Sequence, residues 1–174
     1  MTPFGEAFAD VVGLEGGYSS NPSDPGNWTG GEVGSGELHG TKYGISAAAF
    51  PTLDIEHLSF SVAQAIYRDR YWHLICGDSL PVPVGLIVFD CAVNQGVGRA
   101  TRILQAAVGA TQDGVIGPMT VAAVRAKTDV RALVLEIAAR RAQAYAETED
   151  TIFWLGWFRR LLSIVGRALA LGGI

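Results

Sequence analysis

The sequence contains few of the residues that bind metals or form disulfides. It has two cysteines and three histidines among 174 residues. His39, His57 and His73 have no close-set ligand partners, so we predict no metal site, and we expect no other cofactor. Cys76 and Cys91 each lie in an apolar segment, which favours two buried thiols, although the sequence also permits a bridge between them.

Several other signals are missing as well. The chain has no Gly-x-Ser-x-Gly nucleophile elbow and no glycine-rich phosphate loop ahead of a Lys-Ser/Thr pair. The stretch from Met1 to Glu6 lacks the basic start and the apolar run of a secretory signal. No apolar run is long enough to cross a membrane. We therefore expect a protein that is made in the cytoplasm without a signal peptide.

The composition is that of a compact globular protein. Hydrophobic residues make up 49% of the chain and charged residues 17%, and the length suits one well-filled core. The formal net charge of −4 argues against nucleic acid as a partner. After Asp150 the chain carries three arginines and no acidic residue. We expect a monomer whose C-terminal tail is locally basic.

The N-terminal stretch predicts a helix that ends in an acidic residue. Thr2 suits the N-cap, Pro3 suits the first helical position, and apolar residues recur at helical spacing up to Val12. Glu15 continues the apolar face, and Gly16-Gly17 can form the left-handed turn that ends a helix. The helix C-terminus and apolar neighbours would raise the pKa of Glu15, as a general acid requires. The alternative is that the Glu15 side chain points away from the helix end into water.

The residues after this helix are turn formers and carry a second carboxylate. Asp24 follows Glu15 by nine residues, within a run rich in Gly, Ser, Asn and Pro. The next segment, 40–46, predicts a short extended piece that returns to the body of the protein. Hydrolysis of a glycosidic bond needs a protonated acid and an ionised partner on the far side of the sugar. A helix-end glutamate facing a solvated loop aspartate meets that requirement.

A glycine-rich loop from Asn27 to His39 separates these two segments. Its one tryptophan, Trp28, either stacks on a sugar ring or pins the loop. Glu32 and Glu37 are rival carboxylates, but their glycine-rich surroundings indicate solvated acids, so they rank below Asp24.

Three motifs carry a resemblance to a known family. They are Glu15-Gly16-Gly17-Tyr18, Asn21-Pro22-x-Asp24-Pro25-Gly26 and Gly40-Thr41-Lys42-Tyr43-Gly44-Ile45-Ser46. Together they resemble the EGGY-type N-acetylmuramidases of glycoside hydrolase family 108, which are found among phage and prophage endolysins. The resemblance covers nearly the whole chain. One difference is the loop 27–39, since the family usually has only a residue or two at this place.

The resemblance implies roles for individual residues. Glu15 would protonate the leaving oxygen, Asp24 would stabilise the oxocarbenium-like state or steer water, and Thr41 would help to hold that water. Further residues are expected to bind substrate: Tyr18, Trp28, Tyr43, Asn94 and Gln95.

Later segments add to the resemblance. The motif from Tyr67 to Trp72 ends a helix that Ser59 caps, and it matches the family's Tyr-Arg-x-x-Tyr-Trp. The segment from Val82 to Val93 is apolar almost throughout, so by pattern it is a buried strand or helix, and its length favours a helix. Asp90 and Asn94 share one face of it and need partners. The resemblance implies that Asn94 hydrogen-bonds the substrate or orients the catalytic Glu15. The alternative is that Asn94 makes a structural hydrogen bond.

The second half of the chain predicts further helices: 99–108, one opened by Pro118, one capped by Asp129, and 153–171. The pattern from Leu104 to Thr120 resembles the peptidoglycan-binding segment of the family. The last helix either completes the core or lies on an anionic membrane surface through its basic, apolar face.

We therefore predict a mainly α, lysozyme-like single domain with a small loop or β-hairpin region near the active site. Residues 1–80 would form the catalytic part, and residues 81–174 a peptidoglycan-binding helical part packed into the same globule. The expected function is that of an endolysin, a bacteriolytic glycoside hydrolase that cleaves the β-1,4 bond between N-acetylmuramic acid and N-acetylglucosamine. It would act on the cell wall after release from the cytoplasm. The alternatives are a lytic transglycosylase and a non-catalytic wall-binding or secretion-accessory protein.

Overall fold

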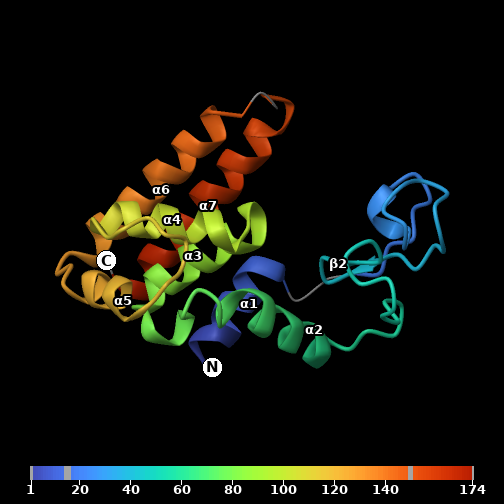
Figure 1. Ribbon diagram of the computed structural model, residues 1–174, viewed down its shortest axis with the longest axis horizontal. Coiled ribbons are helices and arrows are strands. Elements are labelled where there is room, and N and C mark those ends of the chain that lie inside the picture. Colours follow the sequence, from blue (N-terminus) through green and yellow to red (C-terminus); the bar gives the residue numbers. More distant parts are fainter. Residues whose placement is uncertain (1, 14–16, 149–150, 174) are drawn as a thin grey trace. The chain divides into compact units, whose positions relative to one another are not determined.

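The computed structural model describes residues 2–13, 17–148 and 151–173. These residues are mainly helical, with one two-stranded sheet, which confirms the predicted fold class. They form two compact units (Figure 1). One unit comprises residues 8–67, and the other comprises the described residues of 1–7 and 68–174. The predicted division near residue 80 stays a prediction.

The first helix begins as the sequence predicts and ends earlier. In α1 (Pro3–Val12), the Thr2 hydroxyl accepts a hydrogen bond from the Gly5 N–H at 3.1 Å, as an N-cap does. Gly13 follows the helix with φ +82°, a left-handed conformation that ends it. The predicted helix end after Glu15 is wrong, because the described helix ends at Val12 and the chain turns at Gly13. Glu15 itself lies outside the described residues.

The smaller unit is built around a short hairpin. Its elements are the 3₁₀ turn η1 (Pro25–Asn27), the antiparallel strands β1 (Thr41–Lys42) and β2 (Ile45–Ser46), and α2 (Phe60–Tyr67). Tyr43 and Gly44 connect the strands with φ +53° and +72°, which is the two-residue hairpin turn whose twist matches the strands. Phe8 anchors this unit, because its ring packs edge-on against Phe60 at 5.2 Å and Tyr67 at 5.3 Å.

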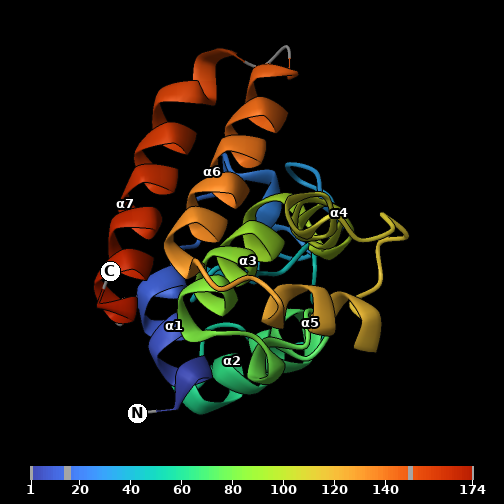
Figure 2. The ribbon, with the colours of Figure 1, turned by 90° about the vertical axis from the view of Figure 1, so that its left-hand side faces the viewer.

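The larger unit is a helical bundle around α3. Its elements are the π-helical turn η2 (Arg68–Trp72), η3 (Gly77–Ser79), α3 (Val82–Gln95), α4 (Val97–Val108), α5 (Pro118–Arg125), α6 (Val130–Ala146), η4 (Thr151–Phe153) and α7 (Trp154–Gly172). Every residue of α3 from Pro83 to Ala92 is buried, which confirms the predicted central helix. Helices α6 and α7 form an antiparallel pair beside α3 (Figure 2). Trp72, the last residue of the Tyr67–Trp72 motif, is 1% exposed and packs against Phe4 and Phe89.

The helix boundaries follow from the predicted caps. Gly109 ends α4 with φ +77°, Pro118 opens α5, and the Asp129 carboxylate accepts the Ala132 N–H at 2.8 Å to cap α6. Helix α7 docks through a buried stripe of Leu161, Ile164 and Ala168. Among the described helices, none combines the length and apolar character that crossing a membrane requires.

Candidate functional site

Asp24 sits on a rigid, exposed turn. Its backbone N–H donates to Asn21 O at 3.1 Å, and its Oδ1 accepts the Gly26 N–H at 2.9 Å, so Asp24 is the N-cap of η1. The other carboxylate oxygen, Oδ2, has no hydrogen bond or ion pair with a described residue. The turn therefore fixes the direction of the carboxylate and leaves one oxygen available to water or substrate.

Backbone hydrogen bonds tie this turn to the hairpin that carries Thr41. The Ala48 N–H donates to Gly26 O at 3.1 Å, and the His39 and Gly40 N–H groups both donate to Asn27 O at 3.0 Å. Asn27 is fully buried. Thr41 exchanges two backbone hydrogen bonds with Ser19, at 2.8 and 2.9 Å, and pairs with Ser46 on its other side. The segments of Asp24 and Thr41 thus belong to one hydrogen-bonded body.

The two tyrosines near the hairpin have different environments. Tyr18 is 38% exposed, and its ring lies so close to Gly40 that an added Cβ there would meet ring atom Cε2 at 2.5 Å. The Tyr43 ring packs edge-on against Phe60 at 5.7 Å, and Tyr43 O accepts the Tyr67 hydroxyl at 3.0 Å. Tyr43 therefore anchors the hairpin, and substrate contact by either tyrosine stays a prediction.

The loop 27–39 is ordered by its own contacts. The Trp28 indole Nε1 donates to Pro22 O at 2.9 Å, which fixes the loop to the Asp24 turn. Of the two predicted roles of Trp28, the structure therefore contains the one in which it holds the loop in place. Trp28 pairs with Leu38 in a β-bridge, and the Thr29 N–H donates to Glu37 O at 2.9 Å. Stacking of Trp28 on a sugar stays a prediction. The rival acid Glu37 is exposed, and its Oε2 lies 2.8 Å from His39 Nε2.

A hollow of about 380 Å³ lies in the same unit. It is lined by Tyr18, Leu38, His39 and residues 52–57, so of the predicted site residues that the structure describes, Tyr18 lies at its wall. At its rim the His57 N–H and ring donate to Asp54, and these hydrogen bonds lower the pKa of the Asp54 carboxyl. Asp54 is thus an ionised group held by a neighbour, which does not suit a general acid.

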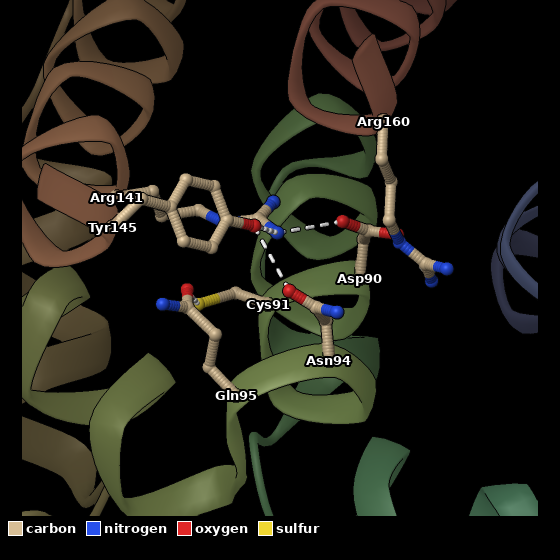
Figure 3. A network of polar contacts seen from close by, with 7 residues as sticks. All are labelled: Asp90, Cys91, Asn94, Gln95, Arg141, Tyr145 and Arg160. Carbon is tan, nitrogen blue, oxygen red and sulfur yellow. Dashed lines mark hydrogen bonds and ion pairs between the residues drawn. The ribbon is translucent and has the colours of Figure 1, made fainter. Parts of the chain in front are cut away.

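The predicted residues Asn94 and Gln95 lie at the end of α3, in the larger unit (Figure 3). Asn94 Oδ1 accepts the Tyr145 hydroxyl at 2.9 Å, and Gln95 Oε1 accepts the Cys91 thiol at 3.3 Å. The structural hydrogen bond of Asn94 is therefore present, while its contact with substrate stays a prediction. Both cysteines are free thiols, and burial raises the pKa of Cys91 to about 11.

The partners of Asp90 are two arginines, one on α6 and one on α7, that no sequence pattern linked to it. Asp90 Oδ2 accepts Arg141 Nη2 at 2.8 Å, and its Oδ1 lies 2.7 Å from Arg160 Nη2 (Figure 3). The Asp90 and Arg141 side chains are 1% and 0% exposed. Burial lowers the pKa of Arg141, but its ion pair and hydrogen bond with Asp90 help to outweigh that effect, so the net pKa rises and the guanidinium stays charged. Tyr145 links this pair to Asn94, because Arg141 also donates to its hydroxyl at 3.0 Å.

The segment predicted to bind peptidoglycan is organised by a buried amide. Gln105 is 1% exposed, and its Nε2 donates to Asp113 Oδ1 at 2.7 Å, Val115 O at 3.1 Å and Thr120 Oγ1 at 3.3 Å. Its Oε1 accepts the Gly114 N–H at 3.0 Å. Gln105 and the Asp113-Gly114 turn therefore hold the α4–α5 connection in place.

The structure thus brings together Tyr18, Asp24, Trp28, Thr41 and Tyr43 in one unit, and Asn94 and Gln95 in the other. Among the described residues, no group of three or more His, Cys, Asp or Glu side chains could hold a metal ion.

Comparisons with known proteins match two parts of the chain. The sequence model of the glycosyl hydrolase 108 family matches residues 8–96, and that of a predicted peptidoglycan domain matches residues 99–162. Among solved structures, the chain is similar to SagA of Brucella abortus, with 34% identical residues and a TM-score of 0.77. That similarity covers 96% of this chain and 94% of SagA. No curated protein matches the chain.

Proposed function

The chain belongs to the glycosyl hydrolase 108 family, and from this premise we propose that it cleaves the β-1,4 bond between N-acetylmuramic acid and N-acetylglucosamine in peptidoglycan. One observation carries the proposal. The match to the family, at residues 8–96, contains every residue predicted for catalysis and substrate binding, and a peptidoglycan domain follows it directly at 99–162. The coarser conclusion is that the protein is a glycoside hydrolase of peptidoglycan.

In the proposed mechanism, Glu15 is the general acid. It donates its proton to the glycosidic oxygen as the bond to the sugar breaks, so that the departing sugar leaves as an alcohol. Positive charge then develops on the ring that remains. A carboxylate held nearby lowers the energy of that oxocarbenium-like state, because the opposite charges attract each other.

Asp24 is proposed as that carboxylate. Its Oδ1 is occupied by the Gly26 N–H at 2.9 Å, which fixes the group without neutralising it, and Oδ2 has no described partner. An oxygen in this state can accept a hydrogen bond from the attacking water or face the developing charge. Thr41 is proposed to hold the water, since its backbone is fixed on both sides by Ser19 and Ser46.

The cellular setting follows from the proposed activity. An enzyme of this kind that is made in the cytoplasm reaches the wall only after release, as phage and prophage endolysins do, and it would be bacteriolytic. We propose that it acts as a monomer. Contact of α7 with an anionic membrane is a further proposal, supported by the exposed Leu155 and Leu162 and by the arginines that the same helix carries.

The test is the chemistry of the fragments. Purified peptidoglycan digested by the wild-type protein should release fragments with new reducing N-acetylmuramic acid ends, identified by mass spectrometry before and after borohydride reduction. Asp24→Asn should retain the fold and lose most turnover, because the replacement is isosteric but uncharged. Anhydro-muramic products, with Asp24→Asn still active, would instead identify a lytic transglycosylase. Binding to the wall without any cleavage would identify a non-catalytic wall-binding protein.

A further inference from the structure

A groove between α4 and α6 combines an apolar floor with a basic rim. Its volume is about 330 Å³. Helix α4 lines it with Arg99, Arg102, Ile103 and Ala106, and α6 lines it with Arg140 and Ala144, among others. These residues recur at intervals of three and four, so each helix presents one continuous stripe to the groove. Small side chains at the floor and arginines at the rim leave room for a narrow, polar chain.

The positive charge of the rim is only partly neutralised. Arg140 is paired with Glu136 at 2.7 Å, and Glu147 at the end of the groove accepts Gln143 Nε2 at 3.0 Å. By contrast, Arg99 has no ion pair with a described acidic residue. Arg102 donates from Nη1 to Gly98 O at 3.2 Å and makes no direct ion pair with a described residue, although it lies near enough to Asp113 to help lower the pKa of that carboxyl.

We propose that this groove binds the peptide stems of peptidoglycan through their carboxylates, an inference that rests on the proposed function. A stem is a short chain with free carboxylates and alanine methyl groups. The planar guanidinium of Arg99 or Arg102 matches a carboxylate in geometry as well as charge. The methyl groups fit against the small floor residues Ala106 and Ala144, in the manner of a pocket with a few oriented polar groups.

The position of the groove in the chain supports this ligand. Both walls lie within residues 99–162, the segment that matches the peptidoglycan domain. The hydrogen bonds of Gln105 fix α4 to the connection that follows it, so the α4 wall rests on a rigid support. Cleavage acts on the glycan and this groove acts on the peptide, so the two activities can be measured separately.

The first experiment measures binding of a free stem peptide by the full-length chain. The probe is L-alanyl-γ-D-glutamyl-meso-diaminopimelate, titrated calorimetrically at low salt. The double variant Arg99→Gln/Arg102→Gln should bind about tenfold more weakly, the effect of losing two solvent-exposed charged contacts. The matched control Arg131→Gln/Arg159→Gln removes the same charge at exposed positions outside the groove and should bind as the wild type does. Equal loss in both double variants would overturn the proposal in favour of non-specific attraction.

Two further probes identify the ligand. A peptide with its carboxylates amidated should lose binding to the wild type, while poly(glycerol phosphate) should bind more weakly than the free peptide. Tighter binding of poly(glycerol phosphate) than of the peptide, or no binding of the peptide by the wild type, would overturn the proposal.

Hydrolysis of glycan strands stripped of peptide separates this inference from the proposed function. The Arg99→Gln/Arg102→Gln variant should cleave such strands at the wild-type rate. If the wild type fails to cleave any peptidoglycan but binds the stem peptide, the proposed function is wrong and the groove stands. If it cleaves but binds no peptide, the groove assignment is wrong and the function stands.

Discussion

Asp90→Asn should destabilise the larger unit strongly. The replacement keeps the shape of the side chain but removes the negative charge that faces Arg141, whose side chain is 0% exposed. Breaking a buried ion pair from one side costs about 3–5 kcal/mol, because the remaining charge stays buried without compensation. The asparagine amide would also place a donor against one of the two arginines, Arg141 or Arg160. For a chain of this size the loss corresponds to a drop in Tm of roughly 6–20 °C.

Equilibrium unfolding in urea measures this cost. Far-UV circular dichroism and tryptophan fluorescence should report the same loss, since Trp157 stacks on Tyr145 of the network at 5.2 Å. The control Arg160→Gln removes the partner that is 37% exposed and should cost no more than about 1 kcal/mol. Replacing both buried partners, as Asp90→Leu/Arg141→Met, should cost less than the two single changes together. An Asp90→Asn protein with a wild-type urea midpoint would refute this reasoning.

Three further outcomes follow from the contacts. Gln105→Ala should lower the free energy of unfolding by roughly 1–3 kcal/mol, because the buried Thr120 hydroxyl and the turn at Asp113 and Gly114 lose their common partner; a calorimetric Tm equal to that of the wild type would contradict this. A thiol reagent at pH 8 should modify Cys76 and leave Cys91 intact until the protein unfolds, because the pKa of Cys91 is about 11 and the residue is 1% exposed; equal labelling rates would be inconsistent with the fold. Trp28→Phe should lower the free energy of unfolding in urea by about 1 kcal/mol through the lost hydrogen bond to Pro22, and an unchanged urea midpoint would contradict this.

The helices of the larger unit could be predicted because local signals define them. Caps at Gly109, Pro118 and Asp129 act within a few residues, and the apolar run of α3 is too long for a typical strand. The end of α1 could not be predicted as well. Gly13 and Gly16-Gly17 are both able to adopt the left-handed turn, and the backbone dihedral that chooses between them is not visible in the sequence.

The partners of Asp90 lie beyond local reasoning, since Arg141 is 51 residues away along the chain. A partial signal exists, because Arg141 lies midway between Ile137 and Tyr145 on the buried face of α6. A charge at such a position requires a buried acid, and Asp90 is the acid within the buried run of α3. That Trp28 stacks on a sugar or holds the loop could likewise be proposed from its place in the loop. Its hydrogen bond to Pro22 could not, because it depends on how the loop folds.

The central claim is that Glu15 supplies the proton for cleavage of the glycan. The direct test compares the clearing of purified cell walls by the wild type, Glu15→Gln and the matched control Glu32→Gln, with unfolding curves for all three. We expect Glu15→Gln to fold as the wild type does and to lose at least about a hundredfold in rate, as removal of a general acid does, while Glu32→Gln clears normally. A Glu15→Gln protein that clears walls at close to the wild-type rate would contradict the account.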